Sequence, residues 1–446
     1  FENNRKMKAV FLPDTIVDIG DRAFYRCTAL TELSLPDGVA NIGKEAFDGC
    51  DALERVGFSA SVKSIGNNAF SCKNLRRVDY SGTVEDWAQI HFATSGANPL
   101  AYAGTLYIDS EPVTEVNLSS VDKVNAYAFY GCTAIVRVTI SGTVVSVGES
   151  AFFGCEALNR VTVGEQLKAF GYRAFGGCKL LQSVYYSGSV CTWAQISFAD
   201  YEANPIHRGG SFYVAGTLEE HITLTNITRI SSYAFVNCGN LKTVSIGTGV
   251  YEIGDGAFMD CHLLQEISLG TETRSIGALA FFGCKTLTAV ELPDTVTVIG
   301  KKAFCGCENL ARVSLPKNLK MIEDELFSGC TNLSAVEIPK TVTVICERAF
   351  FGCAELKIED IGSGAFSGCD SLKYNSDGFA YYLGSDTFDY VALIDWKEEV
   401  TLESYDIPNG CRLLYFRSLY RCKNLSKVSI PDSVITIGDL AFAGVL

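Results

Sequence analysis

Apolar residues recur along this chain with a fixed period of 23 residues. Most repeats contain the sequence Ala-Phe-x-x-Cys-x-x-Leu, in which the named positions are apolar and the intervening ones vary. Self-similarity at a period of 20 to 50 residues is typical of a solenoid or a repeat array. The predicted core positions of the repeats include Phe24, Cys27, Leu30, Phe47, Cys50, Leu53, Phe304, Cys307 and Leu310.

The polar and apolar positions of the first complete repeat predict a short strand. Leu33 and Leu35 alternate with Glu32 and Ser34, which is the two-residue period of a strand with one buried face. We therefore expect the two leucines to face the core and the two polar side chains to face outward. Pro36 then ends the strand.

The remainder of the repeat predicts a return to the core on another side of the coil. Val39 and Ile42 lie three residues apart, and Gly43 permits a tight bend before the next Ala-Phe pair. Stacked coils of this kind would place about sixteen strands side by side in one parallel sheet, on the order of 75 Å long at roughly 4.8 Å per strand. The unit length lies in the range of leucine-rich repeats.

The predicted fold is therefore a β-rich leucine-rich-repeat solenoid of the α/β class. We expect a curved right-handed coil with a parallel sheet on one face, short strands, turns and 3-10 segments on the other, and little α-helix. Because each repeat packs only on its neighbours, residues 1–446 are predicted to form a single elongated domain. The sequence starts within one repeat and stops within another, which suggests a fragment of a longer precursor.

Two insertions interrupt the period and are copies of each other. Residues 80–118 and 186–224 share Trp-Ala-Gln-Ile and Asn-Pro sequences that are displaced by 106 residues. Each is predicted to contain a short helix, capped by Thr83 or Ser189, followed by a β-hairpin. A third irregular unit spans residues 353–422, where aromatic residues predict a protruding pair of strands.

The repeat sequence resembles one known family. The combination of L-x-x-V-x-L-P, V-x-x-I-G and A-F-x-x-C is similar to the BspA-like leucine-rich repeats, also called the Treponema pallidum type. This resemblance implies a secreted or surface-exposed solenoid of host-associated bacteria or protists that engages host or neighbouring-cell proteins, in several members as an adhesin. The family motif consists of core positions only, so it assigns no binding residues.

Composition and charge narrow the class of function. The chain is 48% hydrophobic and 20% charged, which predicts a fully folded protein. Its net charge of −14 argues against bulk binding to nucleic acid or to an anionic membrane surface. No stretch approaches about 18 consecutive apolar residues, so the sequence predicts no transmembrane helix.

The 18 cysteines are interpreted chiefly as structural thiols. Most occupy one position of the repeat, where a small apolar thiol with a weak S–H donor suits a buried corner near backbone carbonyls. Cys305 and Cys307 are close enough to suggest a metal site, but Cys307 is a regular core position, and no metal is predicted. The cysteines outside the repeat position, for which a disulfide stays open, are Cys191, Cys305, Cys346 and Cys411.

Enzymatic function finds little support in the sequence. The four histidines have no partner at metal-ligand or catalytic spacing. Gly362-Ser363-Gly364 resembles a phosphate-binding loop only because glycines recur at the corners of the coil. We therefore predict no catalytic residue and no cofactor.

One column of outward positions on the predicted sheet is rich in arginine: Arg55, Arg77, Arg137 and Arg160. Arginines on adjacent strands repel one another unless an acidic group intervenes. One interpretation is a charge ladder that is compensated by Glu115 and Asp79. The other is a cationic groove for acidic protein segments or glycans.

Aromatic residues in the irregular segments supply the second group of candidate binding residues: Trp87, Trp193, Tyr381 and Trp396. Trp and Tyr are common anchors at protein interfaces. The alternative is that each insertion uses its tryptophan as its own small core. Deep burial of the two insertion tryptophans would exclude them as anchors.

The sequence thus predicts a non-enzymatic, extracellular or cell-surface binding module of the adhesin type. Its partner would be a protein or a glycan, without nucleic acid or membrane insertion, and we expect a monomer. The alternative function is a rigid spacer that presents another domain of a longer surface protein.

Overall fold

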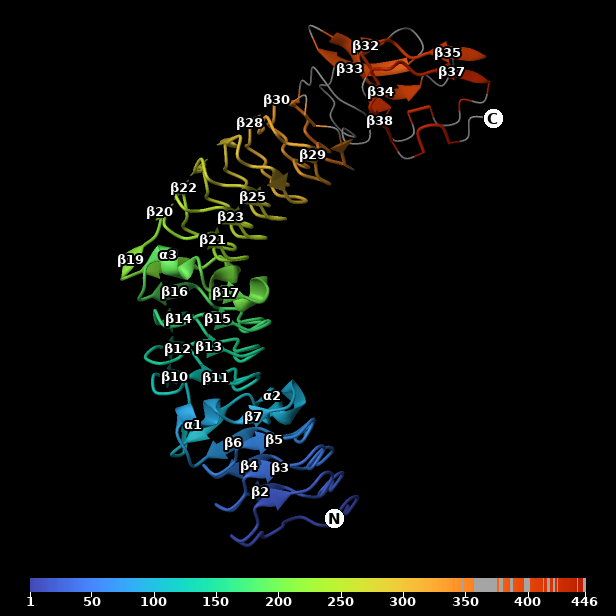
Figure 1. The fold of residues 1–446 in the computed structure, drawn as a ribbon. Coiled ribbons are helices and arrows are strands. Elements are labelled where there is room, and N and C mark those ends of the chain that lie inside the picture. The colour runs from blue at the N-terminus through green and yellow to red at the C-terminus, as the bar shows by residue number, and fades with distance from the viewer. Residues whose placement is uncertain are drawn as a thin grey trace. The chain divides into compact units, whose positions relative to one another are not determined.

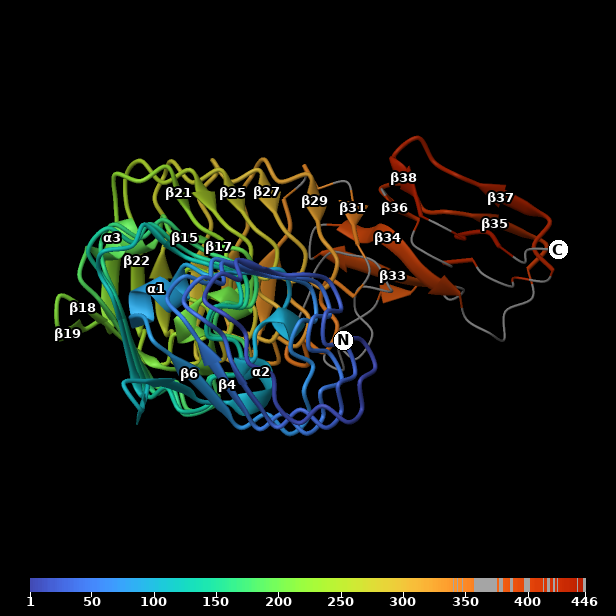
Figure 2. The same ribbon diagram turned by 90° about the horizontal axis from the view of Figure 1, so that it is seen from below.

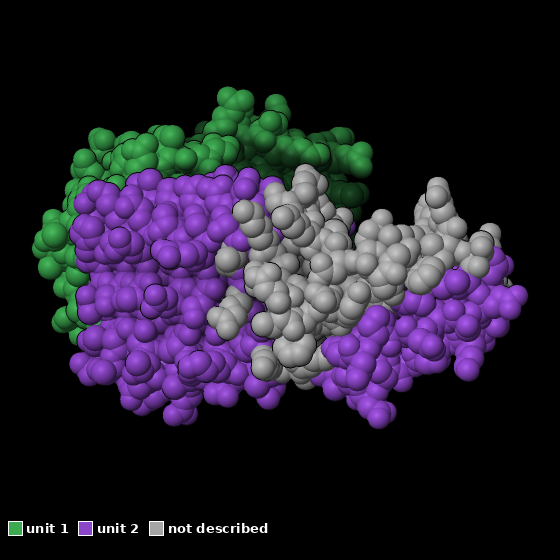
Figure 3. Space-filling model, turned by 90° about the horizontal axis from the view of Figure 1, so that it is seen from above, with its two compact units in different colours: residues 1–219, 233–240 green, residues 220–232, 241–446 purple. Residues whose placement is uncertain are grey.

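The computed structural model describes most of the chain in two compact units. Unit 1 comprises residues 1–219 and 233–240, and unit 2 comprises residues 220–232 and 241–446 (Figure 3). The described residues are 1–339, 341–342, 344–346, 348–356, 375–376, 380–385, 388–396, 402–411, 413–414, 418–419, 422, 424–438 and 440–443.

Unit 1 is a β-solenoid in which each coil contributes one long and one short strand. The long strands pair in parallel with those of the next coil, so that Leu33, Val56 and Val78 meet in register (Figure 1). They form two sheets, β2 (Glu32–Ser34), β4 (Arg55–Phe58), β6 (Arg77–Tyr80), β8 (Leu106–Ile108) and β9 (Glu111–Pro112), then β10 (Glu115–Leu118), β12 (Arg137–Ile140), β14 (Arg160–Val163), β16 (Ser183–Tyr186), β18 (Ser211–Val214) and β19 (Thr217–Leu218).

The two-residue strands of unit 1 form a second parallel stack. Their members are β1 (Asp18–Ile19), β3 (Asn41–Ile42), β5 (Ser64–Ile65) and β7 (His91–Phe92), then β11 (Lys123–Val124), β13 (Ser146–Val147), β15 (Ala169–Phe170) and β17 (Ser197–Phe198). The helices all lie in the insertions, α1 (Val84–Ala88), η1 (Ser95–Ala97), α2 (Leu100–Ala103), α3 (Val190–Trp193), η2 (Tyr201–Ala203) and η3 (Pro205–Arg208).

Unit 2 continues the same coil architecture in its first part. Its long strands are β20 (His221–Leu224), β22 (Thr243–Ile246), β24 (Glu266–Ser268), β26 (Ala289–Glu291), β28 (Arg312–Ser314) and β30 (Ala335–Glu337). Its short strands, several of which Figure 2 labels, are β21 (Arg229–Ile230), β23 (Glu252–Ile253), β25 (Ser275–Ile276), β27 (Val298–Ile299), β29 (Met321–Ile322) and β31 (Val344–Ile345).

The last part of unit 2 contains an antiparallel strand pair. The strands β33 (Ala380–Ser385) and β34 (Phe388–Trp396) pair with each other, and β32 (Asn375–Ser376) adds to β33. The side chains of Tyr381 and Trp396, like residues 357–374, lie outside the described part of the chain. The other strands here are β35 (Ser404–Asp406), β36 (Leu413–Leu414), β37 (Lys427–Ser429) and β38 (Thr436–Ile437).

The predicted solenoid with a parallel sheet and little helix is confirmed, and β2 shows why. Leu33 is buried while Glu32 and Ser34 are exposed, as the two-residue alternation requires. The prediction of one uninterrupted sheet is wrong, because the insertion hairpins intervene. β8 pairs with the antiparallel strand β9, and β18 pairs with the antiparallel strand β19. The second strand of each hairpin therefore occupies the sheet edge where the long strand of the next coil would otherwise pair.

The core of the coils is a ladder of stacked phenylalanines beside a ladder of thiols. The rings of Phe24 and Phe47 are 5.1 Å apart and within 3° of parallel. Cys50 donates its S–H to the carbonyl of Phe24 over 3.1 Å, and burial raises the pKa of this thiol to about 12. Cys307 makes the same contact with Phe281 O at 3.2 Å. These contacts match the structural role expected of the repeat cysteines.

Gly43 is required by the approach of neighbouring coils rather than by an unusual backbone angle. A Cβ at this position would lie 2.5 Å from the backbone nitrogen of Asp21 in the preceding coil. Gly66 meets Lys44 in the same way, with a contact of 2.6 Å. The glycine of the V-x-x-I-G sequence therefore sets the spacing between coils, which the single repeat does not reveal.

The two insertions are built on the same hydrogen bonds. Thr83 caps α1 and Ser189 caps α3, each with a reciprocal capping box, in agreement with the prediction. Trp87 donates its indole N–H to Ala128 O over 2.7 Å, and Trp193 donates to Ala234 O over 2.7 Å. An equivalent asparagine, Asn98 or Asn204, donates to the same carbonyl over 2.9 Å.

Candidate functional site

The arginine column of the sequence forms two separate pairs on the long strands of unit 1. Arg55 on β4 lies beside Arg77 on β6, and Arg137 on β12 lies beside Arg160 on β14. The strands fix these positions because each arginine precedes an inward-facing valine. The structure therefore brings the four predicted arginines together as two pairs, and the two pairs lie on different sheets.

Each of these arginines has a partner in the structure. Asp79 on β6 accepts a hydrogen bond from Arg55 Nε at 2.7 Å and one from Arg77 Nη2 at 2.8 Å. Arg137 Nη1 lies 2.7 Å from a carboxylate oxygen of Glu115. Arg160 instead lies over the ring of Tyr185, 3.9 Å from its centroid. The column therefore agrees with a compensated ladder rather than with a cationic surface.

The carboxylate of Asp79 links the two arginines of the first pair, Arg55 and Arg77. Burial by itself raises the pKa of this carboxyl, but hydrogen bonds from Arg77 and Arg55 outweigh that effect, and the net pKa is lowered. Arg77 is also held from its other side, because its guanidinium lies 3.9 Å from the centroid of the Tyr107 ring on β8. The four side chains thus form one fixed array, Arg55, Asp79, Arg77 and Tyr107.

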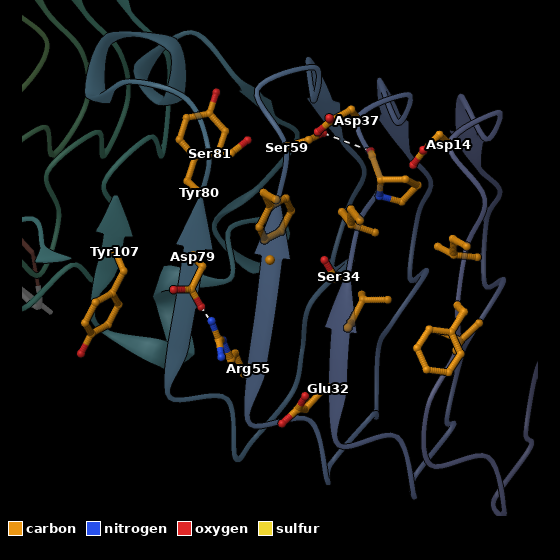
Figure 4. A pocket seen from close by; sticks show the side chains of 18 of the residues that line it. Asp14, Glu32, Ser34, Asp37, Arg55, Ser59, Asp79, Tyr80, Ser81 and Tyr107 are labelled. Atoms are coloured by element: carbon orange, nitrogen blue, oxygen red, sulfur yellow. Dashed lines mark hydrogen bonds and ion pairs between the residues drawn. The ribbon is translucent and has the colours of Figure 1, made fainter. Parts of the chain in front are cut away.

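A groove with a volume of about 850 Å³ crosses the outer face of this sheet (Figure 4). Figure 4 shows Arg55 directed at Asp79 in its middle and Tyr107 on the next strand. Glu32 lies toward one end of the strands, whereas Asp14 and Asp37 lie toward the other. Ser34 and Gly57 leave its floor open, because they carry little or no side chain.

A second hollow of about 490 Å³ lies beside the second insertion, over β16 and β18. Here the rings of Tyr185 on β16 and Tyr213 on β18 stack 4.5 Å apart at 5°. Tyr185 takes the place of Asp79, and Tyr213 takes the place of Tyr107, each displaced by 106 residues. The two insertions therefore share their framework but present different side chains on the sheet.

Models of one repeat family match nearly the whole chain. The matches cover residues 1–106, 104–216, 228–357 and 354–445, in six copies, and the model describes a BspA type leucine rich repeat region. The chain belongs to this family. No curated protein matches the chain.

Several solved structures resemble this BspA-type chain. A leucine rich cell surface protein from Faecalibacterium prausnitzii is 26% identical, with a TM-score of 0.46, covering 72% of this chain and 83% of that one. A leucine-rich repeat protein from Bacteroides ovatus is 22% identical, with a TM-score of 0.44, covering 80% and 87%. The leucine rich repeat protein of T. pallidum is 25% identical, with a TM-score of 0.26, covering 52% and 82%.

The tryptophans of the two insertions are not contact residues. Trp87 and Trp193 are both fully buried, with none of their surface exposed, so the prediction that they anchor a partner is wrong. Their rings fill the interior of the BspA-type coil, where Trp193 packs on Tyr186 and Phe212 at centroid distances of 5.2 and 4.8 Å. Each insertion uses its tryptophan as a core residue.

Tyr107 and Tyr185 were missed, and both occupy the middle outward position of their strands. That column is small at Thr139 and Thr162, but it contains the two tyrosines as well as Asp79, which was expected to compensate the arginines. The signal that would have found them is the register of the strands that flank the insertions. Those strands carry aromatic or acidic side chains where the neighbouring plain coils β12 and β14 carry threonine.

The tyrosines that begin the two insertions, Tyr80 and Tyr186, occupy equivalent positions but differ in the hydrogen bonding of their hydroxyl groups. Tyr186 donates to Thr192 Oγ1 over 3.0 Å, whereas the buried hydroxyl of Tyr80 has no partner among the described residues. Asp86 replaces Thr192 in the first insertion, and its carboxylate accepts from Thr83 instead. Burial raises the pKa of Tyr80 to about 12.

We expect Tyr80→Phe to raise the free energy of unfolding by about 1 kcal/mol, because it removes an unsatisfied buried hydroxyl. Tyr186→Phe should lower the same quantity by about 1 kcal/mol, because it breaks a hydrogen bond. Urea denaturation followed by circular dichroism measures both. Changes of the same sign in the two variants would contradict the assignment of the hydrogen bonds.

His207 introduces a pH-sensitive group beside the second hollow. Its Nδ1 lies 2.8 Å from Asn204 O, its Nε2 has no partner in the described residues, and only 6% of the side chain is exposed. Burial lowers the pKa of His207, although the Asn204 carbonyl acts in the opposite direction. The charged groups that act on it are Glu202, Arg208 and Asp200.

The unfolded chain takes up a proton at this histidine near its ordinary pKa of about 6.5, but the native imidazole resists protonation. The free energy of unfolding therefore decreases as the pH falls from about 7.5 to about 5.5. His207→Ala, which copies Ala101 of the first insertion, should lose less stability over this range. Urea midpoints at the two pH values test this, with the exposed His91→Ala as control. Equal pH dependence of His207→Ala and the wild type would contradict it.

Proposed function

We propose that this chain is a non-enzymatic binding module of a bacterial cell surface, which acts in adhesion to host or neighbouring-cell proteins. Membership of the BspA-type repeat family and the resemblance to a leucine rich cell surface protein support the location and the class of function. No helix within the described residues is both long and apolar enough to cross a membrane.

The observation that carries the proposal is the fixed array across β4, β6 and β8. Arg55, Asp79, Arg77 and Tyr107 are held by hydrogen bonds and by a cation–π contact, and they line or border an open groove. Binding to side chains that are already ordered costs less conformational entropy than binding to mobile ones. The array is therefore suited to recognition.

The alternative of a rigid spacer draws support from the same salt bridges. Ion pairs that are complete within the molecule need no partner, and exposed ones contribute only about 0 to 1 kcal/mol to stability. The two functions differ in what they expect of the groove. A spacer requires only that the surface be soluble, whereas a binding module loses its ligand when the array is removed.

A binding screen against extracellular-matrix proteins, mucins and host glycans tests the proposal. For each ligand found, Arg55→Ser/Arg77→Ser should weaken binding about tenfold or more, because it removes the groups that organise the groove. Lys44→Ser/Lys73→Ser, which removes the same charge from exposed positions outside the groove, serves as the control. Absence of any ligand, or equal affinity of both variants, would favour the spacer.

A further inference from the structure

We propose that the groove over β2, β4, β6 and β8 accommodates an extended segment of a protein partner that is rich in lysine or arginine. This inference rests on the proposed function, because it names the chemistry of the partner at the same sheet. It is the opposite of the second interpretation of the arginine column, a cationic groove for acidic protein segments or glycans.

The charge of the groove lining favours a basic segment. Arg55 is the one basic residue of the lining, and it shares the carboxylate of Asp79 with Arg77, which borders the groove. Four further carboxylates line the groove, and none of them forms an ion pair within the described part of the chain. All four are exposed, namely Asp14, Glu32, Asp37 and Asp109. Lysine or arginine side chains of a partner would compensate this excess of negative charge.

The placement of these carboxylates matches an extended chain that lies across the strands. Glu32 stands at one end of the strands, and Asp14 and Asp37 stand at the other, so that they border the groove on both sides (Figure 4). The hairpin turn adds Asp109, which adopts the left-handed backbone angle of 53° that a tight turn requires. Alternate side chains of an extended segment point in opposite directions and would reach the two borders in turn.

The length of the groove sets the length of the segment. Residues 9–14, β2, β4, β6 and β8 contribute successive positions to the lining. At roughly 4.8 Å between neighbouring strands, these five positions span about 19 Å. An extended chain advances about 3.3 Å per residue, so about six residues of a partner fill this distance.

One observation independent of the carboxylates points to a ligand here. Phe11 lines the groove with 95% of its surface exposed, although a large ring in water is costly and its face attracts a cation. The lining thus contains an uncovered aromatic ring beside the carboxylates.

The second hollow supplies an internal comparison. Its lining contains Arg208 and no carboxylate, and Ala215 occupies the hairpin position that corresponds to Asp109. Attraction of a basic segment to that place is therefore not expected. The sheet beside the first insertion thus presents carboxylates, whereas the sheet beside the second presents the stacked rings of Tyr185 and Tyr213.

The test uses a fluorescein-labelled peptide of eight residues in which pairs of adjacent lysines alternate with pairs of serines, so that lysines point to both sides, and a second peptide in which glutamate replaces lysine. Fluorescence anisotropy measures the affinity of the whole chain for each peptide. Glu32→Gln/Asp37→Asn removes two groove carboxylates, and Glu165→Gln/Asp122→Asn removes two exposed carboxylates elsewhere in unit 1. The matched pair separates the groove from the general attraction of a chain of net charge −14.

We expect the lysine peptide to bind the wild type and the control variant alike, and the groove variant about tenfold or more weakly. The inference is overturned if the wild type does not bind the lysine peptide, if it binds the glutamate peptide as tightly, or if both variants lose affinity equally. Failure of the proposed function is a separate result, because it is judged by host ligands and Arg55→Ser/Arg77→Ser. A ligand sensitive to that change, with no preference for the lysine peptide, would retain the binding module and reject the basic partner.

Discussion

Trp193→Ala is expected to lower the free energy of unfolding by about 3 to 5 kcal/mol. The indole is fully buried and packs against Tyr186, Phe198 and Phe212, so its removal leaves a large apolar cavity. It also removes the hydrogen bond from the indole N–H to Ala234 O. That carbonyl keeps the bond from Asn204, which limits the polar part of the cost.

Urea denaturation followed by circular dichroism measures this loss. Trp193→Phe keeps most of the ring volume and should lose only about 1 to 2 kcal/mol. Tyr201→Ala, at a ring that is 46% exposed in the same insertion, serves as the control for aromatic removal and should change little. A loss below about 1 kcal/mol in Trp193→Ala would mean that the insertion does not depend on its tryptophan as a core.

Phe304→Ala, in a coil of unit 2, is also expected to lower the free energy of unfolding by roughly 3 to 5 kcal/mol. Its ring is fully buried in a continuous stack, 5.2 Å from Phe281 and 5.7 Å from Phe327. Because each coil is stabilised mainly by its neighbours, a gap in the stack weakens two interfaces at once.

Hydrogen exchange with mass spectrometry measures the local effect of Phe304→Ala. Protection should fall most in the coils on either side, including the amide of Phe281, which donates to Ala303 O. Phe351→Ala is the matched control, since that ring is 40% exposed and its removal leaves no cavity. Equal losses of protection in the two variants would show that the buried stack is not the source of stability.

The repeat predicted the fold because one period contains all the information that a coil needs. Leu33 faces inward between exposed neighbours, and Phe24, Cys27 and Leu30 are buried in the places that the period assigns to them. The insertion helices were also predictable, because Thr83 and Ser189 are typical capping residues. These features depend on local sequence or on strict repetition.

Contacts between coils were harder to predict because a single repeat does not contain them. Gly43 proved necessary for the approach to Asp21, one coil earlier, and not only for a bend. The hairpin strands β9 and β19 end the parallel ladders, although the period alone suggests one long sheet. The direction of the insertion tryptophans depends on the carbonyls of Ala128 and Ala234, which lie 41 residues farther along the chain.

The candidate site was predicted only in part. The four arginines were found, because they stand in one column of the repeat, and Asp79 and Glu115 were expected to compensate them, whereas the stacking of Arg77 on Tyr107 requires the register across an insertion. Asp79 holds Arg55 and Arg77, and Tyr185 covers Arg160. The carboxylates that dominate the groove come from separate strands and turns, so no linear motif unites them.

The central claim is that the groove on the outer sheet face of unit 1 is the surface that binds a partner. Gly57 lies in the groove, and a Cβ there would be 3.5 Å from Ser34 Oγ, which is an ordinary contact. Gly57→Tyr should therefore fill the groove without straining the strand. Ser268→Tyr, at an exposed outward position of β24, adds the same side chain to unit 2.

The most direct measurement is the affinity of these two variants for a host ligand identified by the binding screen, with circular dichroism to confirm that both are folded. We predict that Gly57→Tyr weakens binding about a hundredfold or more, which corresponds to about 2.7 kcal/mol, while Ser268→Tyr binds as the wild type does. Unchanged affinity of the folded Gly57→Tyr variant would contradict the claim.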